Sequence, residues 1–105
     1  MTGPFPIVFT RRASSSILET ADWWRENRLD APEAVAEELT RALDILRYQP
    51  EAGAVAENVR LRGVRRILLA RIHYHLYYRP RTRPRRIEIL EIWHAQRGSD
   101  PDFRD

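Results

Sequence analysis

The sequence predicts an α+β fold in which an antiparallel helical hairpin packs on a small antiparallel β-sheet. Three observations lead to this prediction: a short β-branched and aromatic run near the N-terminus, two stretches with helical periodicity, and three later runs of strand-forming residues. In chain order the elements are β-α-α-β-β-β, a layered arrangement of helices on one sheet. The chain of 105 residues has the length of one domain, so we expect residues 1–105 to form a single domain.

The first expected element is a strand at the edge of the sheet, over residues 7–10. Its sequence, Ile-Val-Phe-Thr, is rich in strand-forming side chains. Pro4 and Pro6 precede it, and proline has no N–H to donate to a neighbouring strand. The segment therefore fits the beginning of an edge strand.

A first helix follows, because Ile17, Ala21 and Trp24 are spaced as one helix face. Its start has two candidates. Thr10 can serve as the N-cap, whereas Ser16 opens a Ser-Ile-Leu-Glu capping box. The sequence leaves both starts open.

A second helix is expected to begin at residues 30–33, Asp-Ala-Pro-Glu, which combine a cap, a first-turn proline and an acidic residue. It should end at about Tyr48, because Pro50 cannot continue a helix. Residues 50–63 should form an irregular connection. The apolar stripe of this helix consists of Val35, Leu39, Ala42, Leu43 and Leu46.

Three strands are expected over residues 64–69, 72–78 and 86–93, joined by short connections into an antiparallel meander. Alternation in the middle strand should direct one face to the helices and leave the other aromatic, imidazole-bearing and cationic. The helix-facing set is Ile72, Tyr74, Leu76 and Tyr78, and the opposite set is His73, His75, Tyr77 and Arg79. Residues 98–105 should form a polar tail.

Composition excludes several classes of protein. The chain has no cysteine, so it can form neither disulfides nor thiolate metal sites, and it has no cysteine nucleophile. Residues 1–10 show no positively charged start followed by an apolar run, no later stretch is apolar for long enough to span a membrane, and there is no glycine-rich phosphate loop. We expect a cytoplasmic protein that does not contact a membrane and needs no cofactor.

Charge is unevenly distributed along the chain. All 18 basic residues are arginine; residues 1–52 have a net charge of −3, and residues 53–105 a net charge of +6. Eight arginines lie within residues 65–86 without an acidic residue among them. This pattern favours an acidic partner, either nucleic acid or a negatively charged protein surface, over an ordinary solvated strand face. The eight are Arg65, Arg66, Arg71, Arg79, Arg81, Arg83, Arg85 and Arg86.

Histidines offer the second candidate chemistry. His73 and His75 share the expected outer strand face, and His94 ends the last strand. No carboxylate has ligand spacing near them, and the surrounding arginines oppose a cation, so no metal site is expected. A ribonuclease needs a base, an acid and cations for the phosphorane, which could be supplied from His75, His94, Tyr77, Arg79 and Arg97. Structural, hydrogen-bonded imidazoles are the alternative interpretation.

The segments 64–69 (VRRILL), 74–79 (YHLYYR) and 87–97 (IEILEIWHAQR) together resemble the RelE/ParE toxin superfamily of bacterial type II toxin-antitoxin systems. The resemblance covers nearly the whole chain. It implies one of two activities: RelE-like members cut messenger RNA on the ribosome, and ParE-like members poison DNA gyrase by protein–protein contact.

The residues matched to the RelE-like nuclease set are incomplete. The paired lysines of that set fall at Arg66 and Leu68, its next strand arginine falls at His75, and Arg97 matches a basic position after the last strand, with no tyrosine following. A nuclease site would therefore consist of His75, Arg66, Arg97 and His94. These departures favour a ParE-like toxin that is not an enzyme; the alternatives are a ribosome-dependent mRNA endonuclease and a basic nucleic-acid-binding module.

The resemblance also implies partners. A cognate ParD-like antitoxin should form a hetero-oligomer with the chain, and DNA gyrase should be its target. Trp23 and Trp24 are adjacent on a helix, so both cannot point into the core, and Trp23 is the candidate contact residue. The residues expected to bind target or antitoxin are Arg65, Arg66, Arg71, Arg79, Trp23 and Tyr77.

Overall fold

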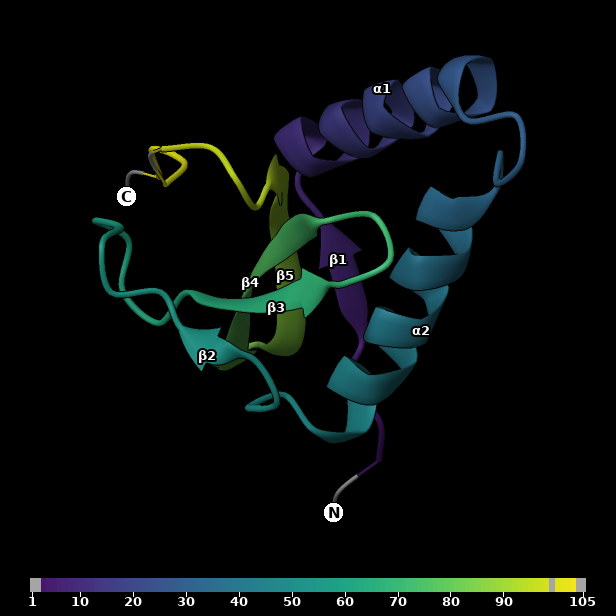
Figure 1. The fold of residues 1–105 in the computed structure, drawn as a ribbon. Helices are drawn as coiled ribbons and strands as arrows, with labels where there is room; N and C mark the ends of the chain where they lie inside the picture. Colours follow the sequence, from purple (N-terminus) through teal and green to yellow (C-terminus); the bar gives the residue numbers. More distant parts are fainter. Residues whose placement is uncertain (1–2, 99, 104–105) are drawn as a thin grey trace.

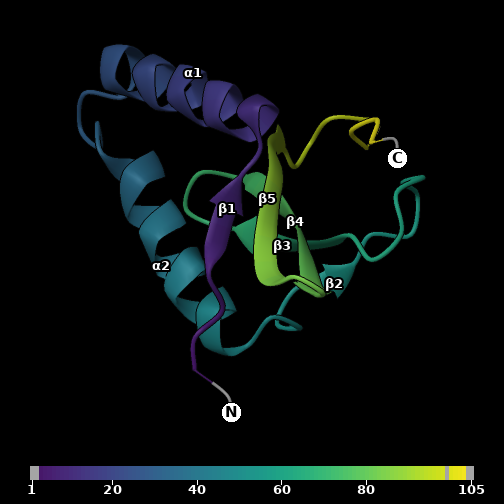
Figure 2. The same cartoon turned by 180° about the vertical axis from the view of Figure 1, so that it is seen from behind.

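The computed structural model describes residues 3–98 and 100–103, which form two helices and a five-stranded sheet (Figures 1 and 2). The helical hairpin precedes the β3–β4–β5 meander in the chain, and the strand order in the sheet is β1-β5-β4-β3-β2, which confirms the predicted α+β fold. The elements are β1 (Ile7–Phe9), α1 (Arg11–Asn27), α2 (Ala34–Tyr48), β2 (Ala54–Val55), β3 (Arg65–Leu69), β4 (Tyr74–Thr82) and β5 (Arg85–His94).

The sheet is mixed. β3, β4 and β5 pair antiparallel as predicted, and β1 adds in parallel to β5 at the sheet edge, with Ile7 opposite Ile87. β2 was not predicted, because residues 50–63 were expected to be irregular throughout. Ala54 and Val55 pair with β3, but two residues are too few to produce an alternating pattern in the sequence.

Helix α1 uses the earlier of its two candidate starts. The Thr10 hydroxyl oxygen accepts a hydrogen bond from the Ala13 N–H at 3.0 Å, so Thr10 is the N-cap and Ser16 lies inside the helix. An arginine near a helix N-terminus is unfavourable because of the helix dipole. Here the Arg12 guanidinium is neutralised by Glu91 of β5, at 2.6 Å.

The predicted start of the second helix was wrong by one turn. Helix α2 begins after Glu33, whose side chain makes no capping hydrogen bond. The Ala31 N–H bonds to the Arg28 carbonyl and the Ala34 N–H to the Ala31 carbonyl, so the segment predicted to start α2 forms successive turns instead. The end at Tyr48 agrees with the prediction.

The main core lies between the helices and one face of the sheet. Leu76 and Tyr78 of β4 contribute to it, and Tyr74 packs against it, as the alternation predicted. Ile72 also contributes, but from the turn before β4, because the strand begins at Tyr74 and not at the predicted residue 72. The Tyr78 hydroxyl donates to the Pro50 carbonyl at 2.8 Å and accepts from the Gly53 N–H at 2.9 Å. This pair of bonds ties the segment after α2 to the middle of the sheet.

The opposite face of the sheet is also covered, contrary to expectation. Tyr77 is buried there in a second apolar cluster, under the β2–β3 loop and the C-terminal segment, both of which lie on the side of the sheet away from α2 (Figure 1). The prediction of a polar tail was therefore wrong at Pro101 and Phe103, which are buried; Ser99, Arg104 and Asp105 lie outside the described residues. The sequence did not indicate this packing, because a single phenylalanine, Phe103, in an acidic segment produces no hydrophobic periodicity. The cluster comprises Leu61, Val64, Tyr77, Leu90 and Phe103.

Candidate functional site

The four residues predicted for a nuclease site gather around one small hollow at the end of the sheet. Arg66 comes from β3, His75 from β4 and His94 from the end of β5, with Arg97 just beyond it. The hollow has a volume of about 160 Å³ and is also lined by Tyr77, Trp93 and Asp100. Strand pairing explains the convergence, because His75 lies opposite both Leu68 of β3 and Trp93 of β5.

Of the two arginines that line this hollow, Arg66 is already bound by neighbouring side chains. The Arg66 guanidinium donates to Asp100 Oδ1 and to the Tyr77 hydroxyl oxygen, both at 3.2 Å. The Tyr77 hydroxyl in turn donates to Asp100 Oδ1 at 2.7 Å. Asp100 thus brings a negative charge into the hollow, and no pattern in the sequence had indicated this.

The two imidazoles of this hollow differ in their chemistry. Burial, followed by the nearby Arg66 guanidinium, lowers the pKa of His75 below 6.5, with Asp100 acting in the opposite direction. His75 is therefore neutral at pH 7. His94 Nδ1 accepts the Gln96 N–H at 3.1 Å, so its ring proton is on Nε2. The Arg97 guanidinium stacks over the Trp93 ring at 4.0 Å.

His73 does not join His75 on a strand face, and this prediction was wrong. It lies in the turn between β3 and β4, with a φ of 60°, and its N–H bonds to the Leu69 carbonyl at 2.9 Å. Within residues 3–98 and 100–103, no three His, Asp or Glu side chains are placed to hold a metal ion. Nor is either helix of that part long and apolar enough to cross a membrane.

The remaining predicted contact arginines are held by neighbouring groups. Arg65 donates to the Gly53 carbonyl at 2.7 Å, and Arg71 bonds to Glu37 at 2.6 Å. Arg79 bonds to Glu88 at 3.0 Å, and Arg81 and Arg86 contact the same carboxylate. The sequence pattern emphasised the absence of acids within residues 65–86 and missed this one two positions later.

Glu88 is buried, and burial alone would raise its pKa. Hydrogen bonds from Arg86 and Arg79 outweigh burial, so the pKa of Glu88 lies below 4.5. The carboxylate is therefore ionised at pH 7. It neutralises part of the arginine cluster instead of leaving the whole cluster free for a polyanion.

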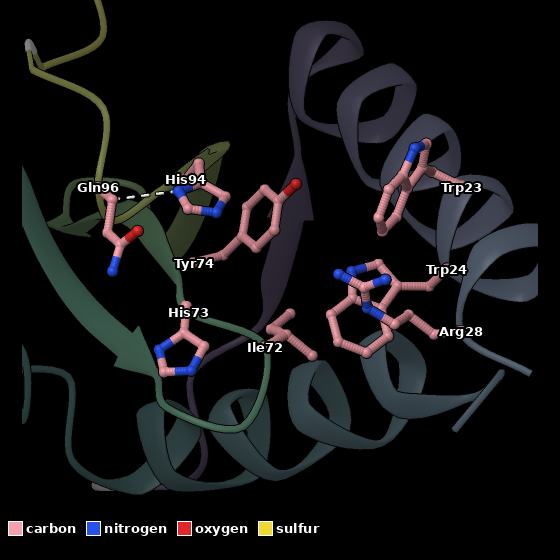
Figure 3. A pocket seen from close by; sticks show the side chains of 8 residues that line it. All are labelled: Trp23, Trp24, Arg28, Ile72, His73, Tyr74, His94 and Gln96. Carbon is pink, nitrogen blue, oxygen red and sulfur yellow. Dashed lines mark hydrogen bonds between the residues drawn. The ribbon is translucent and has the colours of Figure 1, made fainter. Parts of the chain in front are cut away.

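A larger hollow of about 440 Å³ lies between the C-terminal half of α1 and the ends of β4 and β5. Figure 3 shows Trp23, Trp24 and Arg28 on one side and Tyr74 and His94 on the other. Trp23 is 46% exposed, in agreement with its prediction as a surface residue. The sequence did not predict that Arg28 or Tyr74 would join it, because their proximity depends on how α1 crosses the sheet.

Comparison with known proteins agrees with this architecture. A chain from the chromosomal ParDE toxin-antitoxin system of P. aeruginosa has the same fold, with a TM-score of 0.68 and 22% identity, over 88% of this chain and 97% of that chain. No curated protein matches this chain at a significant level. The family model for the ParE toxin of the type II toxin-antitoxin system parDE matches residues 7–98. The chain therefore belongs to the ParE toxin family of type II toxin-antitoxin systems.

Proposed function

We propose that this chain inhibits bacterial growth by poisoning DNA gyrase through protein–protein contact in the cytoplasm, and that a cognate ParD-like antitoxin neutralises it in a hetero-oligomer. Membership of the ParE family supports the proposal. The observation that carries it is the engagement of Arg66, the one cation matched to the strand lysines of RelE-like nucleases. Its guanidinium is bound by Asp100 and Tyr77.

This arrangement suits a contact surface better than phosphoryl chemistry. Cleavage of RNA develops negative charge on the phosphorane, which requires cations aimed at it. Asp100 would instead repel a phosphate, and Leu68 offers no charge at the second lysine position. Arg97 is the remaining strong cation of the hollow, and it stacks on Trp93.

One observation favours a second candidate, a RelE-like ribosome-dependent mRNA endonuclease. His75, His94, Arg66 and Arg97 line the same hollow, and His75 is neutral at pH 7, as a general base must be. The two candidates make opposite predictions for His75, so they can be separated by experiment.

The deciding measurement is supercoiling of relaxed plasmid by purified gyrase, titrated with the folded chain. We expect inhibition or linearised plasmid, reversed when antitoxin is added. The His75→Ala variant should retain this activity and its growth inhibition, because a contact poison needs no base. If the wild-type chain leaves plasmid topology unchanged but stops growth, and folded His75→Ala does not, the gyrase proposal is wrong and messenger cleavage replaces it.

A further inference from the structure

The hairpin of β4 and β5 continues past β3 as a two-stranded ribbon. β3 pairs with β4 only as far as Tyr78, whereas β4 and β5 pair with each other up to Thr82 and Arg85. Ile87 of this ribbon belongs to the main core, so the residues before and after it, and their partners across the ribbon, face away from the helices. The residues on this outer face are Arg79, Arg81, Arg86 and Glu88.

Two more arginines extend this face. Arg83 is exposed in the turn at the end of the ribbon, and Arg62 is exposed in the β2–β3 loop. A Cβ at the neighbouring Gly63 would lie 3.7 Å from side-chain carbons of Arg79, so the loop passes directly beside the ribbon. Within the part of the chain that the structure describes, neither Arg62 nor Arg83 forms a hydrogen bond or an ion pair. We call the set Arg62, Arg79, Arg81, Arg83 and Arg86 the basic face.

The basic face keeps a large positive charge after its internal pairing. Glu88, the carboxylate of the ribbon, contacts three of the five arginines. The five arginines and this glutamate together have a net charge of +4, against +3 for the whole chain. In the adjoining loop the charges of Glu57 and Arg60 cancel. A field of this strength on one face attracts a polyanion.

The side chains around the basic face indicate which polyanion fits it. A protein partner would need an apolar or aromatic anchor in the interface, and none of the exposed large apolar side chains lies within residues 56–63 or 79–88. Single-stranded nucleic acid would need aromatic rings on which its bases stack, and these two segments contain no Phe, Tyr or Trp. A duplex keeps its bases stacked inside and offers its phosphates, which guanidinium groups bind through two donors at once.

We infer that the basic face binds the phosphate backbone of duplex DNA. Phosphate contacts carry no sequence information, so the binding does not depend on the DNA sequence. The choice of duplex DNA over duplex RNA rests on the proposed function, because gyrase acts on DNA. The chain then contacts the DNA that gyrase holds in addition to the enzyme itself.

Fluorescence anisotropy with a labelled DNA duplex of about 20 base pairs tests this inference on the folded chain, without gyrase or antitoxin. We expect a Kd of about 1–100 μM near physiological salt, the range of sequence-independent contacts. If about four phosphates are neutralised, log K should fall with log salt concentration at a slope of about −3.6. A duplex of unrelated sequence should bind within about twofold of the first.

A double variant, Arg62→Gln with Arg83→Gln, removes two charges from the basic face. It should weaken duplex binding by about tenfold or more and make the salt slope less negative by about two. The matched control, Arg11→Gln with Arg25→Gln, makes the same change in net charge on α1, which lies across the end of the sheet opposite the β4–β5 turn (Figures 1 and 2). The control should stay within about twofold of wild type, because salt screens charges beyond about 10 Å. All four arginines are exposed, and circular dichroism verifies that both variants are folded.

Glu88→Gln provides a test that a loss of folding cannot imitate. It removes the carboxylate that three arginines share, so duplex binding should tighten by about threefold or more. If the wild-type chain does not bind duplex DNA, or if the double variant and its control lose affinity equally, the inference is wrong. Tighter binding of single-stranded DNA or of duplex RNA than of duplex DNA would show that the partner is assigned wrongly.

These outcomes are separate from those of the gyrase experiment. A chain that binds duplex DNA through the basic face but leaves gyrase unaffected overturns the proposed target and not this inference. A chain that inhibits gyrase without binding DNA overturns this inference alone. If the double variant binds DNA like wild type but loses its antitoxin, the basic face is a protein-binding surface instead.

Discussion

Glu88 shows how a single carboxylate can neutralise part of an arginine cluster that appears uniformly basic in the sequence. Arg79, Arg81 and Arg86 all contact its carboxylate, at distances of 2.6–3.6 Å. The hairpin register creates the cluster, because Arg79 pairs with Glu88 and Arg81 with Arg86 across β4 and β5. Composition alone could not predict this neutralisation, since Glu88 lies just beyond the arginine-rich segment.

Glu88→Gln should lower the free energy of unfolding by about 1–3 kcal/mol at pH 7, because three guanidiniums lose a shared, nearly buried charge. The folded-state pKa of Glu88 lies below 4.5, so its contribution is present above that pH and is lost as pH falls through the folded pKa. The difference in free energy of unfolding between Glu88→Gln and wild type should therefore become smaller at acidic pH. Urea denaturation at several pH values measures it, with exposed Glu19→Gln as the control. Equal stability of Glu88→Gln and wild type at pH 7 would contradict the role assigned to the cluster.

At the scale of elements, periodicity was most informative within each helix and strand and least informative at their ends. The alternation of Tyr74, Leu76 and Tyr78 correctly predicted the helix-facing side of β4. It failed at His73, where the chain turns with a positive φ. The ends of helices and strands depend on hydrogen bonds and ion pairs with distant segments. At the start of α1, Arg12 forms such an ion pair with Glu91 of β5.

The two candidate caps of α1 give a matched pair of variants. Thr10→Ala should reduce the free energy of unfolding by about 1 kcal/mol, because the Ala13 N–H loses its acceptor. Ser16→Ala should change stability by less than about 0.5 kcal/mol, because Ser16 lies within the helix and alanine has the highest helix propensity. Thermal denaturation of both variants provides the comparison. A greater loss for Ser16→Ala would place the effective cap at the later position.

At the scale of the molecule, the sheet is enclosed from both sides. The helices cover one face, while the β2–β3 loop and the C-terminal segment cover the other. The gathering of His75, His94 and Arg97 followed from strand order and from the superfamily resemblance. The presence of Asp100 in the same hollow could not be predicted, because it depends on how the C-terminal segment packs against the sheet, which no local pattern in the sequence encodes.

We expect Phe103 to be the residue that anchors the C-terminal segment against the sheet. It is 6% exposed, its ring centroid lies 5.6 Å from that of Tyr77, and the Arg12 guanidinium covers it at 5.1 Å. Phe103→Ala should lower the free energy of unfolding by about 3 kcal/mol, from lost burial and the cavity left behind. Phe103→Leu keeps most of the apolar volume and should cost less than half as much. Urea denaturation distinguishes them, and an unchanged midpoint for Phe103→Ala would show that the loop alone closes this face of the sheet.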